Sequence, residues 1–370
     1  MRIAFVGGGT GGHFYPLIAT AESIVVLNPT AELIYIGPTS FNEVELKANG
    51  IRHVYCPAGK MRRYFSLANF LDMFKTGAGV FVALYQLFIW YPDVVFSKGG
   101  YTSVPVLIAA RFYRIPVVIH ESDSKPGRAS LLARRFARYI GIAYAEVAEY
   151  FPAGKTALVG IPIRRVIATT DTDPFSKLGI PNDMPLIFVT GGSLGADRIN
   201  SLVLKSLTRL LPQYRIFHQT GAELEQTVIQ TAQSLVTDPA LLSRYYVKGS
   251  ISAGTIAALL DASSLVITRA GSTSLFEIAL HGKPSIVIPI PEEISHDQRT
   301  NAYAYARSGA ASVLEEGNLT ENLLTAEIQS IMGDADKYQH MSASARIFAR
   351  PDAAHMVATA LISIGVEHGS

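Results

Sequence analysis

Short runs of apolar residues alternate along the chain with longer segments in which apolar residues recur every three or four positions. The short runs predict buried strands, and the segments between them predict helices. The expected strands lie at residues 2–6, 33–36, 52–56, 93–96, 116–120, 139–142, 156–159, 186–190, 214–217, 244–247, 264–268, 285–289 and 312–314. Because strands and helices alternate throughout, we expect an α/β fold with parallel sheets covered by helices on both faces.

Residues 168–184 interrupt this pattern with Thr, Asp, Pro and Gly, which are typical of turns. The chain is also long enough for two domains with separate cores. We therefore expect a Rossmann-like N-terminal domain at 1–165, a linker at 166–184 and a Rossmann-like C-terminal domain at 185–350. The two domains are expected to face each other across a cleft, and a last helix at about 352–370 could pack back on the first.

Each expected domain opens with a strand that runs into a glycine-rich turn. The turns are Gly7-Gly8-Gly9-Thr10-Gly11-Gly12-His13 and Gly191-Gly192-Ser193-Leu194-Gly195-Ala196. Glycines let the backbone approach a ligand closely, and free N–H groups at the start of the next helix suit a phosphate. Ligands of parallel sheets bind beyond the carboxyl ends of the strands. The segments 98–101 and 120–123, which follow predicted strands, should therefore lie beside the first turn.

Both turns match motifs of other enzyme classes. Gly7-x-Gly9-x-x-Gly12 matches the dinucleotide fingerprint. The end of the second expected strand reads Tyr35-Ile36-Gly37-Pro38-Thr39 and lacks the acidic residue that would hold a ribose, which disfavours hydride transfer. Gly191-x-Ser193-x-Gly195 matches the nucleophile elbow of hydrolases. An elbow leaves the first turn unexplained, so we favour a phosphate cradle in which the Ser193 hydroxyl and main-chain N–H groups are donors.

Two further patterns have structural alternatives. Asp171-x-Asp173 and Asp334-x-Asp336 resemble a metal-binding pair, but each lies in a turn-like segment where a carboxylate typically caps a helix. We predict no bound catalytic metal. Residues 269–277 follow a strand and start a helix; there, Ser274 and Glu277 fit a capping box and a pyrophosphate and ribose cradle equally well.

Charge is unevenly distributed. Residues 1–165 contain 18 Lys and Arg against 10 Asp and Glu, whereas residues 166–370 contain 14 against 20. The basic half is expected to meet an anionic surface or substrate. No nucleic-acid-binding module is recognisable in it, and the single cysteine, Cys56, fits a reducing compartment.

The segment 60–90 contains the features that suggest a membrane. The uncharged apolar run from Thr76 to Trp90 is shorter than the ~20 residues that span a bilayer. Basic and aromatic residues at 60–75 favour shallow docking on an anionic membrane, to which the basic helix at 128–138 could contribute. Residues 78–90 are expected to form a buried domain helix.

The motifs together resemble the MurG family of glycosyltransferases, part of glycosyltransferase family 28. The resemblance covers nearly the whole chain and rests on the segments 8–13, 93–103, 120–123, 160–164, 191–196, 269–277 and 296–302. It implies a GT-B fold and inverting transfer of N-acetylglucosamine from UDP-N-acetylglucosamine to the C4 hydroxyl of the N-acetylmuramoyl unit of lipid I, undecaprenyl-pyrophosphoryl-MurNAc-pentapeptide. It also implies a peripheral enzyme at the cytoplasmic face of the bacterial plasma membrane, possible contact with other cell-wall enzymes, and no cofactor or metal.

The resemblance also implies roles for particular residues. Substrate binding would involve Thr10, Gly11, Gly12, Tyr101, Asp123, Arg164, Ser193, Ile251, Ser272, Thr273, Ser274, Glu277 and Gln298. Within this set, Arg164 and Ser193 would bind the diphosphate and Glu277 the ribose, and the main chain near Ile251 would recognise uracil. Asp123 and Ile161 depart from the family, which often has Asn at the first of these positions and usually has Asn at the second.

Transfer requires a base for the acceptor hydroxyl and stabilisation of the departing UDP. His13 is the first candidate for the base because an imidazole titrates near neutral pH, and Glu121 is the second. Two alternatives are a UDP-N-acetylglucosamine 2-epimerase, which needs no lipid acceptor, and a non-catalytic subunit that only binds nucleotide-sugar or anchors a partner at the membrane.

Overall fold

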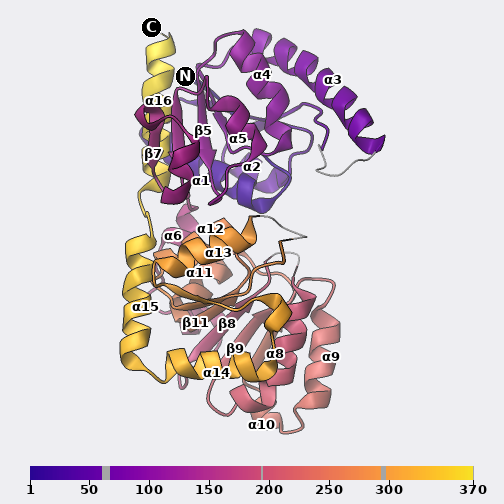
Figure 1. The fold of residues 1–370 in the computed structure, drawn as a ribbon, viewed down its shortest axis with the longest axis vertical. Helices are drawn as coiled ribbons and strands as arrows, with labels where there is room; N and C mark the ends of the chain where they lie inside the picture. Colours follow the sequence, from indigo (N-terminus) through magenta and orange to yellow (C-terminus); the bar gives the residue numbers. More distant parts are fainter. Residues whose placement is uncertain (61–66, 193–194, 293–296, 370) are drawn as a thin grey trace. The chain divides into compact units, whose positions relative to one another are not determined.

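A computed structural model of the chain describes residues 1–60, 67–192, 195–292 and 297–369. The chain divides into two compact units, one formed by Met1–Arg165 with Pro351–Ser370 and the other by Val166–Arg350. Each unit is built on its own parallel sheet (Figure 1). All thirteen expected strands are present, within a few residues of their expected ends.

The first unit contains a seven-stranded sheet in the order β3-β2-β1-β4-β5-β6-β7, in which all pairs are parallel. The strands are β1 Arg2–Val6, β2 Glu32–Gly37, β3 Ile51–Tyr55, β4 Val94–Ser97, β5 Val117–Glu121, β6 Tyr139–Ile142 and β7 Thr156–Leu158. The helices are α1 Gly11–Leu27, α2 Glu43–Ala48, α3 Leu67–Trp90, α4 Val104–Phe112, α5 Arg128–Ala133 and α16 Ala353–Gly369, with short 3₁₀ turns η1 Tyr101–Ser103, η2 Ala145–Tyr150 and η3 Ala153–Lys155.

Alternate residues of β1 enter different cores, as the two-residue period of a strand requires. Ala4 and Val6 pack with residues of α3, α4 and α5 on one face of the sheet. Ile3 and Phe5 pack with α1 and the C-terminal α16 on the other face. In Figure 1 the yellow α16 runs beside the first unit's sheet, so the end of the chain belongs to the N-terminal domain.

The second unit contains a six-stranded parallel sheet in the order β10-β9-β8-β11-β12-β13. The strands are β8 Leu186–Thr190, β9 Arg215–Gln219, β10 Tyr245–Lys248, β11 Ser263–Thr268, β12 Ser285–Val287 and β13 Ala311–Val313. The helices are α7 Pro174–Leu178, α8 Asp197–Leu210, α9 Glu225–Leu235, α10 Pro239–Leu242, α11 Ala253–Ala262, α12 Ser272–Leu280, α13 Gln298–Arg307, α14 Glu321–Met332 and α15 Ala335–Phe348; η4 is Glu316–Asn318 and α6, at the boundary of the units, is Arg165–Ala168.

The linker expected at 166–184 is wrong, because this segment is part of the second unit. Its turn-forming residues start the short helix α7: the Asp173 side chain accepts a hydrogen bond from Ser176 N, and Pro174 begins the helix. The backbone N–H of Asp171 donates to Asp261 at 2.7 Å, and Lys177 pairs with Asp171 at 2.9 Å. The segment therefore packs on α11 rather than crossing solvent.

Helix α3 differs from two expectations: that its apolar run is too short to cross a membrane, and that residues 78–90 form a buried helix. It is one continuous helix, and its residues Phe70–Trp90 are long and apolar enough to cross a membrane, with a mean hydropathy of 1.3 over 21 residues. A narrow strip containing Gly79, Ala83 and Leu87 is buried against the rest of the unit. The expectation of a buried helix at 78–90 is therefore wrong, because most residues of this segment are not buried. The basic residues at 62–63, which were expected to dock on a membrane, lie outside the described residues.

The exposed side of α3 carries large apolar residues near both ends of the helix, at residues 70–74 and 81–89. We call this surface the α3 face; its most exposed side chains are Phe70, Leu71, Phe74, Phe81, Tyr85, Phe88 and Ile89. Their spacing follows the helical period on the side opposite Ala83 and Leu87. Figure 1 shows α3 lying along α4, so this helix is an integral element of the first unit with one apolar side uncovered.

Candidate active site

The first glycine turn holds His13 at the start of α1. Thr10 is the N-cap residue of this helix, and its Oγ1 lies 2.8 Å from His13 Nδ1. The Tyr35 hydroxyl fixes the turn from below by donating to the carbonyl of Gly7 at 2.8 Å. A Cβ atom added at Gly100 would lie 4.0 Å from His13 Nε2. The turns after β1 and β4 therefore meet, as expected, with His13 at their junction.

The same junction holds two side chains from the turn after β4. The Tyr101 ring would lie 3.5 Å from a Cβ at Gly9, so it flanks the first turn. Thr102 Oγ1 is buried and has no hydrogen-bond partner among the described residues, and Cβ atoms at Gly8 and Gly100 would lie 3.8 and 3.9 Å from it. A buried hydroxyl without a partner is costly and points to a bound group. Thr102 is not among the site residues that the sequence predicts.

Lys98, at the end of β4, is only 2% exposed. Its ammonium donates to Nδ1 of His120 at 2.5 Å and to the hydroxyl of Ser122. His120 Nε2 in turn donates to the carbonyl of Gly160 at 2.6 Å. Burial lowers the pKa of Lys98 to about 7, although Glu121 and Asp123 favour its charged form. Burial, with the Lys98 charge, holds the pKa of His120 well below its ordinary value.

Glu121 is buried at the end of β5, and its carboxylate holds the following loop. Its two oxygens accept hydrogen bonds from the backbone of Asp123 at 3.2 Å and of Gly127 at 2.9 Å. Burial and the neighbouring charge of Asp123 raise its pKa to about 7, against the hydrogen bonds it accepts. Both oxygens are already engaged within the loop, which makes Glu121 better suited to positioning the loop than to removing a substrate proton.

His13 is half-buried, and burial lowers its pKa below the ordinary 6.5. The Lys98 charge acts in the same direction, whereas Asp123 opposes both. The imidazole is consequently neutral at neutral pH. If Nδ1 donates to Thr10, Nε2 is free to accept a proton from a ligand beside Gly100.

Arg164 lies in the first unit, where it contacts two residues that the sequence did not connect to it. Its guanidinium lies 4.0 Å from the centre of the Tyr15 ring and pairs with Glu45 at 3.2 Å. Its Nε is buried and has no partner among the described residues, which leaves one donor for an anion. Ile161, a departure from the family pattern, is fully buried, so this position contributes packing.

In the second unit, the start of α12 forms the best-defined cradle. Ser274 is the third residue of this helix and Gly271 is its N-cap, so the capping box is wrong. Ser272 is buried, and Thr273 Oγ1 is buried without a partner among the described residues. A helix N-terminus with an unsatisfied hydroxyl suits a phosphate. Glu277 follows one turn later in the same helix.

Gln298 joins the turns after two neighbouring strands of this unit. Its Oε1 accepts hydrogen bonds from the backbone of Ala270 at 3.2 Å and of Ile290 at 3.3 Å. Arg269 is fixed in the same region by Glu316 at 2.5 Å. The side chain of Gln298 therefore shapes the loop that precedes α12.

The second glycine turn packs closely on its neighbour. A Cβ at Gly195 would lie 2.1 Å from the carbonyl oxygen of Thr220. A Cβ at Gly249, in the segment expected to face uracil, would lie 2.7 Å from Ala222 Cα. Ile251 is half-buried just before α11. Ser193, expected to bind phosphate, lies outside the described residues.

One aspartate of each pair caps a helix, as expected for turn-like segments. Asp173 caps α7, and Asp334 caps α15 by accepting from Lys337 N at 3.0 Å. The predicted site residues thus form one set in each unit. The first unit contains Thr10, Gly11, Gly12, His13, Tyr101, Glu121, Asp123 and Arg164, and the second contains Ile251, Ser272, Thr273, Ser274, Glu277 and Gln298.

Comparison with family models agrees with this division. The N-terminal domain of glycosyltransferase family 28 matches residues 3–142, and the C-terminal domain of the same family matches residues 186–357. Each model therefore falls on one of the two parallel sheets.

Curated relatives match over most of their length. UDP-N-acetylglucosamine–N-acetylmuramyl-(pentapeptide) pyrophosphoryl-undecaprenol N-acetylglucosamine transferase of Treponema denticola is 35% identical over 331 residues, which are 84% of this chain and 83% of that protein. The protein of the same name from Shouchella clausii is 37% identical over 349 residues, which are 93% of this chain and 94% of that protein.

Solved structures show the same fold. Acinetobacter baumannii MurG aligns with a TM-score of 0.76 at 24% identity, over 98% of this chain and 99% of that chain. A UDP-GlcNAc 2-epimerase from Neisseria meningitidis, bound to UDP-GlcNAc, aligns with a TM-score of 0.69 at 15% identity, over 98% of this chain and 100% of that chain. At these identities the likeness extends to architecture alone.

Proposed function

The chain belongs to glycosyltransferase family 28, and from this membership we propose that it transfers N-acetylglucosamine from UDP-N-acetylglucosamine to undecaprenyl-pyrophosphoryl-MurNAc-pentapeptide. Its curated relatives carry the name of this activity. The proposal depends on one observation: the chain contains both family domains, and each has side chains suited to binding a ligand at the carboxyl edge of its sheet. A dehydrogenase or a hydrolase would not require two such domains, each with its own set of binding groups.

The first unit supplies the base. The C4 hydroxyl of the N-acetylmuramoyl unit loses its proton to Nε2 of His13 as its oxygen attacks the anomeric carbon of the donor. Thr10, 2.8 Å from Nδ1, holds the ring in the required orientation. A neutral imidazole is needed for this step, and burial lowers the pKa of His13 in the direction that maintains it. Glu121 positions the adjoining loop.

The second unit supplies the nucleotide site. The N-terminus of α12 and the hydroxyl of Thr273 donate to the diphosphate, which gains negative charge as the bond to the sugar breaks. Glu277 accepts hydrogen bonds from the ribose hydroxyls, and Gln298 holds the sugar. The leaving group is stabilised by these fixed dipoles and by Arg164, so the proposed reaction requires no metal ion.

The decisive assay supplies purified protein with UDP-N-acetylglucosamine and a water-soluble lipid I analogue in the presence of EDTA. We expect UDP release that depends on the acceptor, with a β-1,4-linked product. Release that stops in EDTA and returns with a divalent cation would refute the metal-free scheme. Epimerised sugar from donor alone would identify a 2-epimerase, and donor binding without turnover would identify a binding subunit.

We also propose that the protein works at the cytoplasmic face of the plasma membrane, attached through the α3 face. The acceptor named for the relatives carries an undecaprenyl chain, which remains in a bilayer. Phe81, Tyr85 and Phe88 are 75, 63 and 67% exposed, and an uncovered apolar helix side of this kind is typical of interfacial docking. Because Ala83 and Leu87 are buried in the domain, α3 would lie along the surface of the bilayer.

A further inference from the structure

A buried set of hydrogen bonds lies behind the second glycine turn, within the second unit. Nδ2 of Asn200, on α8, donates to the carbonyl of Thr220 at 3.0 Å, directly after β9. Oδ1 of Asn200 lies 3.0 Å from Nε2 of His218, and Nδ1 of His218 lies 2.7 Å from the hydroxyl of Tyr245 on β10. All four residues are buried. We call them the His218 network.

The chemistry of the partners fixes the direction of every bond in the His218 network. A backbone carbonyl can only accept, so the amide nitrogen of Asn200 faces Thr220 and its oxygen faces His218. Nε2 of His218 therefore donates, and burial, which lowers the pKa of His218 to about 3, keeps the ring neutral. Nδ1 then accepts from the Tyr245 hydroxyl. Because each group has one consistent partner, the network holds the Thr220 carbonyl in one position.

The Thr220 carbonyl supports the second glycine turn. A Cβ at Gly195 would lie 2.1 Å from this oxygen, so the glycine turn packs directly on it. A second link runs through the preceding residue of β9: the Thr190 hydroxyl donates to Gln219 at 2.8 Å and accepts from Gly192 N at 3.1 Å. The turn after β9 thereby sets where the second glycine turn lies.

The turn after β9 also meets the segment expected to recognise uracil. A Cβ at Gly249 would lie 2.7 Å from Ala222 Cα and 3.1 Å from the carbonyl oxygen of Gly221. Thr220 N donates to the carbonyl of Lys248 at 3.0 Å. Strands β8, β9 and β10 are neighbours in the sheet, so the turn after β9 lies between the other two turns. It therefore sets the spacing between a phosphate site at the glycine turn and a base site after β10.

We propose that Asn200, His218 and Tyr245 are positioning residues that set the distance between the diphosphate and the uracil of the donor. This inference rests on the proposed function and assigns to it residues that lie behind the nucleotide site. A nucleoside diphosphate bridges both sites, so its affinity depends on their spacing, whereas a nucleoside occupies only the base site. A network that served stability alone would affect both ligands equally.

Calorimetric titration of the full chain with UDP and, separately, with uridine tests this. Asn200→Leu removes the donor to Thr220 at similar volume and should weaken UDP binding about tenfold, with less than about a twofold change for uridine. Tyr245→Phe keeps the ring and removes one hydroxyl, so it should lower the ratio of UDP affinity to uridine affinity about two- to threefold. This second variant decides the test if Asn200→Leu does not fold.

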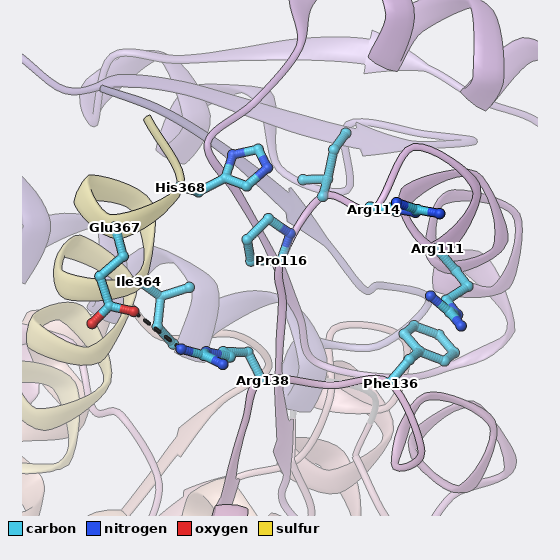
Figure 2. A pocket seen from close by; sticks show the side chains of 9 residues that line it. Arg111, Arg114, Pro116, Phe136, Arg138, Ile364, Glu367 and His368 are labelled. Carbon is cyan, nitrogen blue, oxygen red and sulfur yellow. Dashed lines mark hydrogen bonds and ion pairs between the residues drawn. The ribbon is translucent and has the colours of Figure 1, made fainter. Parts of the chain in front are cut away.

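Two control variants remove contacts outside the His218 network. Ser206→Ala removes a buried hydrogen bond to the Leu202 carbonyl, 2.9 Å long, in the same helix α8. Arg138→Gln removes the ion pair with Glu367 at 3.2 Å, drawn as a dashed line at a pocket of the first unit in Figure 2. Both should bind UDP and uridine as the wild type does.

The outcomes separate this inference from the proposed function. An unchanged affinity ratio in folded Asn200→Leu or Tyr245→Phe would overturn the positioning role, and so would an equal loss of affinity for both ligands. The proposed transfer would still stand in those cases, because the wild type would bind UDP. If the wild type binds neither UDP nor uridine, the proposed nucleotide site fails, and the positioning role fails with it.

Discussion

The ammonium nitrogen of Lys98 lies 2.5 Å from Nδ1 of His120, and both side chains are buried beneath the first glycine turn. Since Nε2 of His120 donates to Gly160, Nδ1 must be the acceptor and the imidazole is neutral. The contact joins the ends of β4 and β5 to the segment that leads to Arg164. A buried cation is thereby fixed close enough to His13 to influence its pKa.

Replacing this cation should alter the pH dependence of transfer. Below pH 7 Lys98 is mostly protonated, because its pKa is about 7, and its charge lowers the pKa of His13. Lys98→Met removes that charge, so the pKa of His13 should rise. The acid limb of the kcat/KM profile should then move to higher pH, by a few tenths of a unit to about one unit. The measurement is a pH profile with a soluble acceptor.

The matched control is Lys47→Met, which removes an exposed lysine paired with Glu43. Its profile should coincide with that of the wild type. Methionine fills much of the volume of a buried lysine side chain, so the Lys98 variant should still fold. An acid limb that stays in place or moves to lower pH would contradict the proposed influence of Lys98 on His13.

Removing the base should affect the chemical step much more than binding. His13→Ala is expected to lower kcat by ~10²–10⁴-fold with little change in either KM. Thr10→Val should have a smaller effect of the same kind, because it removes only the group that orients Nδ1. In the wild type, activity should fall with acid only below pH 6.5, since the pKa of His13 is lower than that. Steady-state kinetics with both substrates varied provides the measurement, and near-normal kcat in His13→Ala would assign the base to another residue.

The architecture was predictable from sequence because parallel strands are buried on both faces and read as uninterrupted apolar runs. Strands such as 2–6 and 186–190 were therefore located within a residue or so. The glycine turns were also predictable, because a run of glycines directly after a buried strand rarely continues as a strand or a helix and so indicates a turn. The position of segments 98–101 and 120–123 at one edge then followed from parallel topology alone.

What the sequence did not predict depends on contacts between distant segments. Nothing local distinguishes Lys98 from an exposed lysine, and its burial arises only when β4 and β5 pair. The stacking of Arg164 on Tyr15 is equally non-local. The segment 166–184 has the composition of a linker, yet Asp173 and Pro174 start a helix. Composition also could not show that only one side of α3 is covered.

The α3 face should determine attachment to membranes regardless of lipid charge. Phe81→Ser with Phe88→Ser removes two exposed rings and should weaken binding to phosphatidylcholine vesicles by about tenfold or more. The melting temperature should hardly change, because neither ring is buried in the core. Vesicle flotation and thermal unfolding together provide the measurement.

Val44→Ser with Tyr55→Ser is the control for the α3 variant, since it removes comparably exposed apolar side chains elsewhere in the same unit. It should bind vesicles like the wild type. Equal binding by both variants would mean that α3 is not the docking helix.

The second glycine turn should tolerate no side chain at Gly195. Gly195 and Gly179 both have positive φ, 77° and 65°, but only at Gly195 would a Cβ meet backbone, 2.1 Å from the Thr220 carbonyl oxygen. Gly179→Ala should cost ~1 kcal/mol of folding free energy from conformation alone. Gly195→Ala should cost ~3 kcal/mol or more, because the turn must also move. Urea unfolding followed by circular dichroism compares them, and equal losses would mean that the turn can relax freely.

Thr273 offers the sharpest test of the nucleotide site because its hydroxyl has no partner among the described residues. Thr273→Val keeps the shape and removes only this hydroxyl. If the hydroxyl binds the donor diphosphate, the KM for UDP-N-acetylglucosamine should rise by about three- to tenfold, the value of one hydrogen bond. The free energy of unfolding without ligand should stay constant or increase, since an unsatisfied polar group is removed.

Thr325→Val provides the opposite case. The Thr325 hydroxyl donates to the Glu321 carbonyl at 2.7 Å in the same unit, so this variant should lose stability and keep a normal KM. Thr273→Val should therefore raise the donor KM and keep its stability, whereas Thr325→Val should keep its KM and lose stability. A Thr273→Val enzyme with unchanged donor KM would show that the α12 N-terminus does not hold the nucleotide through this group.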